Sequence, residues 1–245
     1  WDGRSEINSF SSNAKEERIS ISIFPGFGPI VNMCISKDEQ LLLCGTKNGC
    51  VIIFDINGYN LVLKEKIFLH TKEITSIAIN DTLNMFATTA QDGYVMLHIL
   101  PSLELVRSIK IKNNLFANKV YLSNSPLPCF TIYISEIRKF ISYTLNGLKI
   151  SEIEEIDYSK FIKCSMVFTN LNFQDFLIYG TDDGLVKIRS FPVMNLIKNV
   201  NPLWGEQINA ICLSPDNKFC YVCGIKNQIA IINDMYEKIE LNAEE

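Results

Sequence analysis

The sequence predicts an all-β protein, a β-propeller of about five and a half four-stranded blades that is incomplete within this chain. Three observations lead to this fold class. Tight-turn residues return at nearly equal intervals along the 245 residues. Each interval holds four short strand-like runs, as a propeller blade does. No amphipathic segment of about 12 residues with helical periodicity and caps stands out.

The turns that define the repeat are Asx-Gly pairs, or degenerate copies of them, between two apolar runs, as in a β-hairpin. Their second residues stand at positions 3, 49, 93, 138, 184 and 228, at intervals of 46, 44, 45, 46 and 44 residues. We expect each turn to join the second and third strands of a blade. The residues assigned to these turns are Asp2, Gly3, Asn48, Gly49, Asp92, Gly93, Arg138, Asp183, Gly184 and Asn227.

The strands of each unit are expected in a fixed order. A first apolar run such as "ITSIAI" is followed by a polar turn and a second run such as "MFATTA". The Asx-Gly turn, a third strand, a second turn and a more polar fourth strand complete the unit. The predicted units are a half blade at 1–23 (third and fourth strands) and blades at 28–67, 70–111, 115–155 (degenerate), 160–200 and 205–241. Because the chain opens inside a unit, we expect an upstream part of the same polypeptide to complete the propeller.

Composition and charge exclude some partners. The formal net charge of −4 argues against a nucleic-acid-binding surface and gives no reason to expect binding to anionic lipid. No apolar run approaches the ~18–20 residues of a membrane span, so direct membrane insertion is not expected. We therefore expect the partners to be proteins.

The residues that could carry chemistry do not form a recognisable catalytic or metal-binding set. Most of the eight cysteines lie in apolar runs, which indicates buried free thiols in a reducing compartment. Cys220 and Cys223 form a C-x-x-C pair, but an offset of three in a strand points their side chains to opposite faces. There is no glycine-rich phosphate loop and no Ser/His/Asp or Cys/His set. We predict no catalytic residue, no metal site and no cofactor.

Three bulky rings recur at one position of the repeat. Phe27, His70 and Trp204 stand 22, 23 and 24 residues before their turn positions, each just ahead of a first strand. A recurring position favours packing between adjacent blades. An exposed aromatic residue in a loop is also typical of a partner-binding hot spot. The two interpretations of Trp204 stay open at the sequence level, with packing preferred.

The repeating unit resembles a WD40 repeat. Phe54-Asp55 stands where that family has Trp-Asp, and His98-Ile99 and Arg189-Ser190 fill the same position in other copies. By this resemblance, His70 occupies the loop position of a structural histidine. The order of the copies resembles the C-terminal propeller of BEACH-domain proteins, the neurobeachin group. The stretches "WDGRSEINSF", "HTKEITSIAIN", "AQDGYVMLHI" and "FTIYISEIRKFISYTLNGLKISE" carry this second resemblance.

The resemblance implies a non-catalytic interaction scaffold in vesicle and membrane trafficking, or in lysosome-related and autophagic processes. A cytoplasmic location follows, with peripheral membrane association through upstream modules. Two alternatives remain. One is a WD40 subunit of an unrelated cytoplasmic complex, because a fold does not fix a function. The other is a propeller hydrolase or lyase, which the missing catalytic set disfavours.

Overall fold

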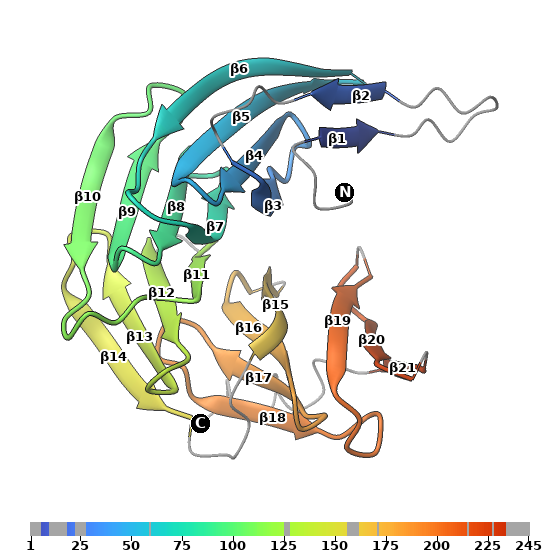
Figure 1. Ribbon diagram of the computed structural model, residues 1–245. Helices are drawn as coiled ribbons and strands as arrows, with labels where there is room; N and C mark the ends of the chain where they lie inside the picture. Colours follow the sequence, from blue (N-terminus) through green and yellow to red (C-terminus); the bar gives the residue numbers. More distant parts are fainter. Residues whose placement is uncertain are drawn as a thin grey trace. The chain divides into compact units, whose positions relative to one another are not determined.

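The structure is a computed structural model that describes residues 6–9, 19–22, 28–58, 60–124, 128–155, 162–170, 172–214, 216–226 and 228–233. Every helix or strand within these residues is a β-strand (Figure 1). Neighbouring strands pair antiparallel. The predicted all-β class is therefore confirmed.

The chain divides into two compact units, and the first comprises residues 1–122. It contains a two-stranded sheet and two four-stranded sheets, whose strands follow chain order from one edge to the other. The two-stranded sheet consists of β1 (Glu6–Ser9) and β2 (Ile19–Ser22). The four-stranded sheets consist of β3 (Ile30–Ile35), β4 (Leu41–Thr46), β5 (Cys50–Asn57) and β6 (Asn60–Phe68), and of β7 (Ile74–Asn80), β8 (Met85–Ala90), β9 (Tyr94–Ile99) and β10 (Leu105–Lys110); the last strand of the unit is β11 (Lys119–Leu122).

The second unit comprises residues 123–245 and repeats the same order. Its strands are β12 (Cys129–Ile134), β13 (Lys139–Thr144) and β14 (Lys149–Glu154), then β15 (Ile162–Thr169), β16 (Asp175–Thr181), β17 (Val186–Ser190) and β18 (Leu196–Val200), and finally β19 (Ile208–Leu213), β20 (Cys220–Gly224) and β21 (Ile229–Ile232). Within the described residues the last sheet has three strands.

Burial explains why the strands have these compositions. The second strands β8, β12 and β16 are buried along their whole length, and their sequences are nearly continuous apolar runs. Strands covered on both faces have no need to alternate apolar and polar residues. The fourth strands β6, β10 and β14 are mostly exposed and carry the charged residues. Within each repeat, the change from apolar to polar sequence therefore follows the change from buried to exposed strands.

Neighbouring sheets within a unit are joined by apolar clusters. In the first unit, Leu43 and Ile53 of one four-stranded sheet cluster with Ile74 and Phe86 of the next. In the second unit a corresponding cluster joins β15–β18 to β19–β21. Full burial of each such side chain contributes about 1.5–3 kcal/mol. Stacked sheets of this kind form a rigid frame for the loops that join them.

None of the described segments forms a helix long and apolar enough to cross a membrane.

Candidate functional site

The predicted turn residues fall between second and third strands wherever the structure describes them. Three glycines have positive φ and donate their backbone N–H to a carbonyl three residues earlier. Arg138 does the same without being glycine, with φ +52° and an N–H bond to Ser135 O of 3.2 Å. Asp2, Gly3 and Asn227 lie outside the described residues. The glycines are Gly49 (φ +80°), Gly93 (φ +81°) and Gly184 (φ +86°).

His70 is buried in a polar network that also holds the Asp92 turn. Its Nδ1 lies 3.1 and 3.2 Å from the two carboxylate oxygens of Asp92, and its Nε2 lies 2.8 Å from Thr88 Oγ1. Asp92 also accepts the backbone N–H groups of Thr71 and Tyr94, both at 3.0 Å. This imidazole, carboxylate and hydroxyl tie the loop before β7 to the β8–β9 turn, so the network has a structural geometry.

The protonation state of this network follows from burial. Burial lowers the pKa of His70, and the opposing effect of the Asp92 carboxylate does not restore it. The ring is therefore neutral at neutral pH, with Nδ1–H donating to Asp92 and Nε2 accepting the Thr88 hydroxyl. His98, in the Trp position of the same blade, is stacked on Phe86 with its Nδ1 buried and without a hydrogen-bond partner. Burial and the nearby His70 lower the pKa of His98 to about 4.

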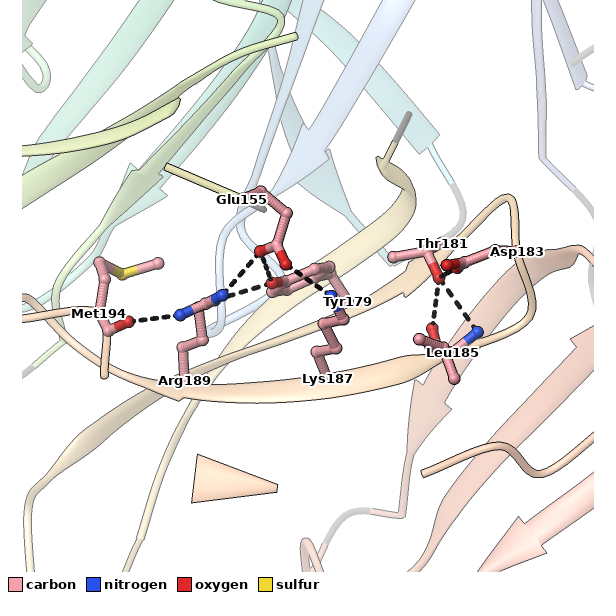
Figure 2. Close-up of polar contacts among 8 residues, drawn as sticks. All are labelled: Glu155, Tyr179, Thr181, Asp183, Leu185, Lys187, Arg189 and Met194. Carbon is pink, nitrogen blue, oxygen red and sulfur yellow. Dashed lines mark hydrogen bonds and ion pairs between the residues drawn. The ribbon is translucent and has the colours of Figure 1, made fainter. Parts of the chain in front are cut away.

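A second buried network lies in the second unit, where Glu155 faces two cations and a phenol (Figure 2). Lys187 Nζ lies 2.5 Å from Glu155 Oε1, and Arg189 Nη2 lies 2.7 Å from Glu155 Oε2. The Tyr179 hydroxyl donates to Glu155 Oε2 at 2.5 Å and accepts from Arg189 Nε at 2.8 Å. Arg189 Nη1 also donates to Met194 O at 2.8 Å. One carboxylate thus fixes both basic side chains against β16 and β17.

Sequence reasoning missed this network. Burial raises the pKa of Glu155, but the bonds from Lys187 and Tyr179 and the charge of Arg189 lower it further, so its pKa lies below the ordinary range. The carboxylate is therefore ionised, as a partner of two buried cations must be. The signal was the spacing of Lys187 and Arg189 within "LVKIRSF". An offset of two places both side chains on one face of an otherwise apolar strand.

Within the part of the chain that the structure describes, the thiols and other metal-ligating groups do not assemble into a site. All eight cysteines are free. Burial raises the pKa of Cys44 and of Cys220 to about 12, so neither thiol is a nucleophile at neutral pH. Cys220 is fully buried whereas Cys223 is partly exposed, as their offset of three predicts. Among the described residues no cluster of His, Cys, Asp and Glu could hold a metal ion.

Trp204 is the prominent exposed side chain, with 93% of its surface accessible. The predicted packing of Trp204 between blades is therefore wrong. Its neighbour Leu203, 3% exposed, occupies the buried position and belongs to the cluster that joins β15–β18 to β19–β21. Sequence spacing located this loop but misassigned the buried side chain by one residue. Of the other two predicted rings, His70 is buried and Phe27 lies outside the described residues.

The Trp204 loop is fixed by hydrogen bonds and by a neighbouring turn. Asn201 Oδ1 accepts the Gly205 N–H at 2.8 Å, and Leu203 O accepts the Glu206 N–H at 3.1 Å. The β16–β17 turn lies directly against this loop: a Cβ added to Gly184 would stand 2.8 Å from Gly205 Cα and 2.7 Å from Glu206 O. A large aromatic side chain is thus held outward on a well-supported loop, which is a geometry for contact with a partner.

Comparison with known proteins agrees with this architecture. The family model described as "WD40: WD domain, G-beta repeat" matches residues 18–55 and 63–98. "BEACH domain-containing protein B" of Arabidopsis thaliana is 20% identical over an alignment of 224 residues, which covers 82% of this chain and 8% of that protein. The chain therefore spans a small part of this relative.

A solved structure gives the same fold. The beta-propeller domain of Myceliophteria thermophila Cps50 (Swd1) superposes with a TM-score of 0.65 at 16% sequence identity, over 83% of this chain and 65% of that one. The chain therefore contains WD40 repeats and has the fold of a WD40-type β-propeller.

Proposed function

We propose that this chain is a non-catalytic protein-binding module. The observation that carries the proposal is the exposure of Trp204, an aromatic side chain on a loop that is held by stacked sheets. Interface hot spots are enriched in tryptophan, and loops on a rigid scaffold are the usual place for binding residues. The buried polar networks at His70 and at Glu155 serve the fold, since their polar groups face each other rather than a cavity.

We further propose that the module works within a larger BEACH-type protein in vesicle and membrane trafficking, on the cytoplasmic side of membranes. Two facts support this assignment. The order of degenerate repeats resembles the C-terminal propeller of that group, and the sequence is similar to part of an Arabidopsis thaliana BEACH domain-containing protein. In this view membrane association comes from other parts of the larger protein, and this chain supplies a protein contact.

Proximity labelling of the full-length protein in its own cells tests the proposal. The intact protein is compared with one in which this 245-residue segment is deleted. We expect the deletion to remove a defined set of neighbours that belong to vesicle or organelle membranes. An unchanged set of neighbours would contradict a binding role. Loss of neighbours from a complex unrelated to membranes would keep the binding role and replace the trafficking assignment.

A further inference from the structure

The Trp204 loop lies against the β16–β17 turn, which carries the carboxylate of Asp183. On the basis of the proposed function, we infer that its partner is an extended, positively charged protein segment that places an Arg or Lys side chain over the Trp204 indole. The inference rests on how the ring is presented, on which charges surround it, and on the chemistry that combines the two.

The backbone presents the ring away from the surface. Trp204 has φ +56°, a conformation that bulky residues rarely adopt, and Gly205 follows with φ +89°. The loop is closed by the Asn201 and Leu203 hydrogen bonds and anchored by the buried Leu203 side chain. Holding a tryptophan outward in this way exposes an apolar ring and costs backbone strain. Strained residues of this kind gather at ligand-binding positions.

The turn beside the loop carries one partly exposed carboxylate, that of Asp183. Asp183 belongs to the β16–β17 turn, whose Gly184 lies against Gly205 and Glu206. The hydroxyl of Thr181 donates to the Asp183 carboxylate and fixes it in the turn (Figure 2). Glu206 is ion-paired with Lys226, so this pair is close to neutral. Asp183 therefore places a negative charge in the turn that lies against the Trp204 loop.

An exposed indole on a loop with a carboxylate in the adjacent turn is a site for a cation. Tryptophan is the strongest of the aromatic side chains in cation–π contacts, and arginine is the most frequent partner. A guanidinium could stack on the ring and pair with a carboxylate at the same time. A second copy of this chain is a poor occupant, because it would bring a net charge of −4. A basic segment of another protein supplies a cation that stacks on the indole and pairs with the carboxylate.

Binding of the purified 245-residue chain to an array of random ten-residue peptides tests this inference. Trp204→Ala removes the ring, and Asp183→Asn removes a charge while keeping an oxygen acceptor. Phe173→Ala is the matched control, because Phe173 is also an aromatic loop residue of the second unit, 72% exposed, with φ +59°. Circular dichroism and thermal melting of each variant establish that the fold is retained.

We expect the peptides bound by the wild type to be enriched in Arg and Lys. Trp204→Ala should weaken their binding at least about tenfold, as loss of a hot-spot residue does. Asp183→Asn should weaken it several-fold, added salt should weaken it further, and Phe173→Ala should leave it unchanged.

Three results would overturn the inference. Equal binding of basic peptides by wild type and Trp204→Ala would move the site elsewhere. Trp204-dependent binding of apolar or acidic peptides would replace the partner chemistry and leave the binding role intact. If no peptide binds, the extended-segment partner is rejected, while the neighbours found by proximity labelling decide the binding role independently.

Discussion

At the scale of single residues, Glu155 is the side chain on which the buried network of the second unit depends. It accepts from Lys187, Arg189 and Tyr179, which are themselves buried. Removing one partner of a buried ion pair leaves an uncompensated charge, which costs far more than a surface pair contributes. The network therefore stabilises β16 and β17 only as a complete set.

We predict that Glu155→Gln lowers the free energy of unfolding by about 3–5 kcal/mol, because Lys187 and Arg189 lose their common counter-charge. Chemical denaturation at pH 7 measures the change. Glu154→Gln is the matched control, since the neighbouring side chain is exposed and should change stability by less than about 0.5 kcal/mol. Equal midpoints for Glu155→Gln and wild type would show that the cations are compensated by other groups.

Because of His98, the stability of the first unit decreases at acidic pH. The folded-state pKa of about 4 is below the ordinary value of 6.5, so between these two pH values the unfolded chain binds a proton that the folded chain does not. The stability that the protein gains by holding His98 neutral is therefore fully present above about pH 6.5, and this contribution is lost as the pH falls toward 4. The unpartnered Nδ1 adds a cost of burial at every pH.

We predict that His98→Phe reduces this acid sensitivity. The phenyl ring keeps an aromatic stack on Phe86 but carries no proton and no unpartnered polar atom. The difference between melting temperatures at pH 7 and pH 5 should be smaller for the variant than for wild type, as thermal melts would show. His70, whose pKa is also lowered, should retain part of the effect. A variant with the wild-type pH profile would remove His98 as a cause.

The limits of sequence reasoning appear at these same residues. The motif position of Arg189 and its Lys187 neighbour was visible, but Glu155 lies 34 residues before Arg189, and only the fold brings the three together. The prediction that Trp204 packs between blades fails for a different reason. The repeat spacing fixes where the loop is, whereas a turn with positive φ at Trp204 and a buried Leu203 decides which side chain faces the core.

At the scale of elements, the turn glycines show what could be predicted and why. A hairpin turn with one residue at positive φ strongly favours glycine, so its position is visible in sequence. Arg138 adopts the same conformation at a cost. Its turn was located because Asn146-Gly147, further along the same repeat, aligns with Asn57-Gly58. The degree of crowding around each glycine depends on distant backbone and has no sequence signal. Gly49 and Gly58, which flank β5, illustrate the difference.

We predict that Gly49→Ala destabilises the first unit much more than Gly58→Ala. Both glycines have positive φ, which costs an alanine about 1–2 kcal/mol. A Cβ at Gly49 would also stand 2.1 Å from the carbonyl oxygen of His70, whereas a Cβ at Gly58 meets nothing within 4 Å. We expect a loss of about 3 kcal/mol or more for Gly49→Ala. Equal losses of unfolding free energy for the two variants in parallel denaturant melts would show that the loop before β7 moves to make room for the added Cβ.

At the scale of the whole molecule, the fold class could be predicted from the periodicity of the sequence. The reason is that each repeat packs its strands in the same way. Apolar second strands lie inside and polar fourth strands outside, and the turns return at one period. Surfaces follow no such period, since each face depends on what covers it. The last sheet, β19–β21, is an example. The face that carries Val222 is buried against β15–β18, and the opposite face is apolar but open within the described residues.

The open face of β19–β21 leads to a prediction about solubility. Cross-strand register places Tyr221 opposite Ile231 and Cys223 opposite Ile229, and the two isoleucines are 57% and 69% exposed. Contiguous apolar surface of this kind promotes association, and lysine on an exposed strand opposes it. We expect the 245-residue chain to associate with rising concentration in sedimentation velocity, and the double variant Ile229→Lys with Ile231→Lys to do so less. Because these side chains are exposed, the thermal midpoint should change little, whereas Val222→Lys, which would bury a charge, should prevent folding. A wild-type chain that stays monodisperse across the same concentrations would show that this face is not available in solution.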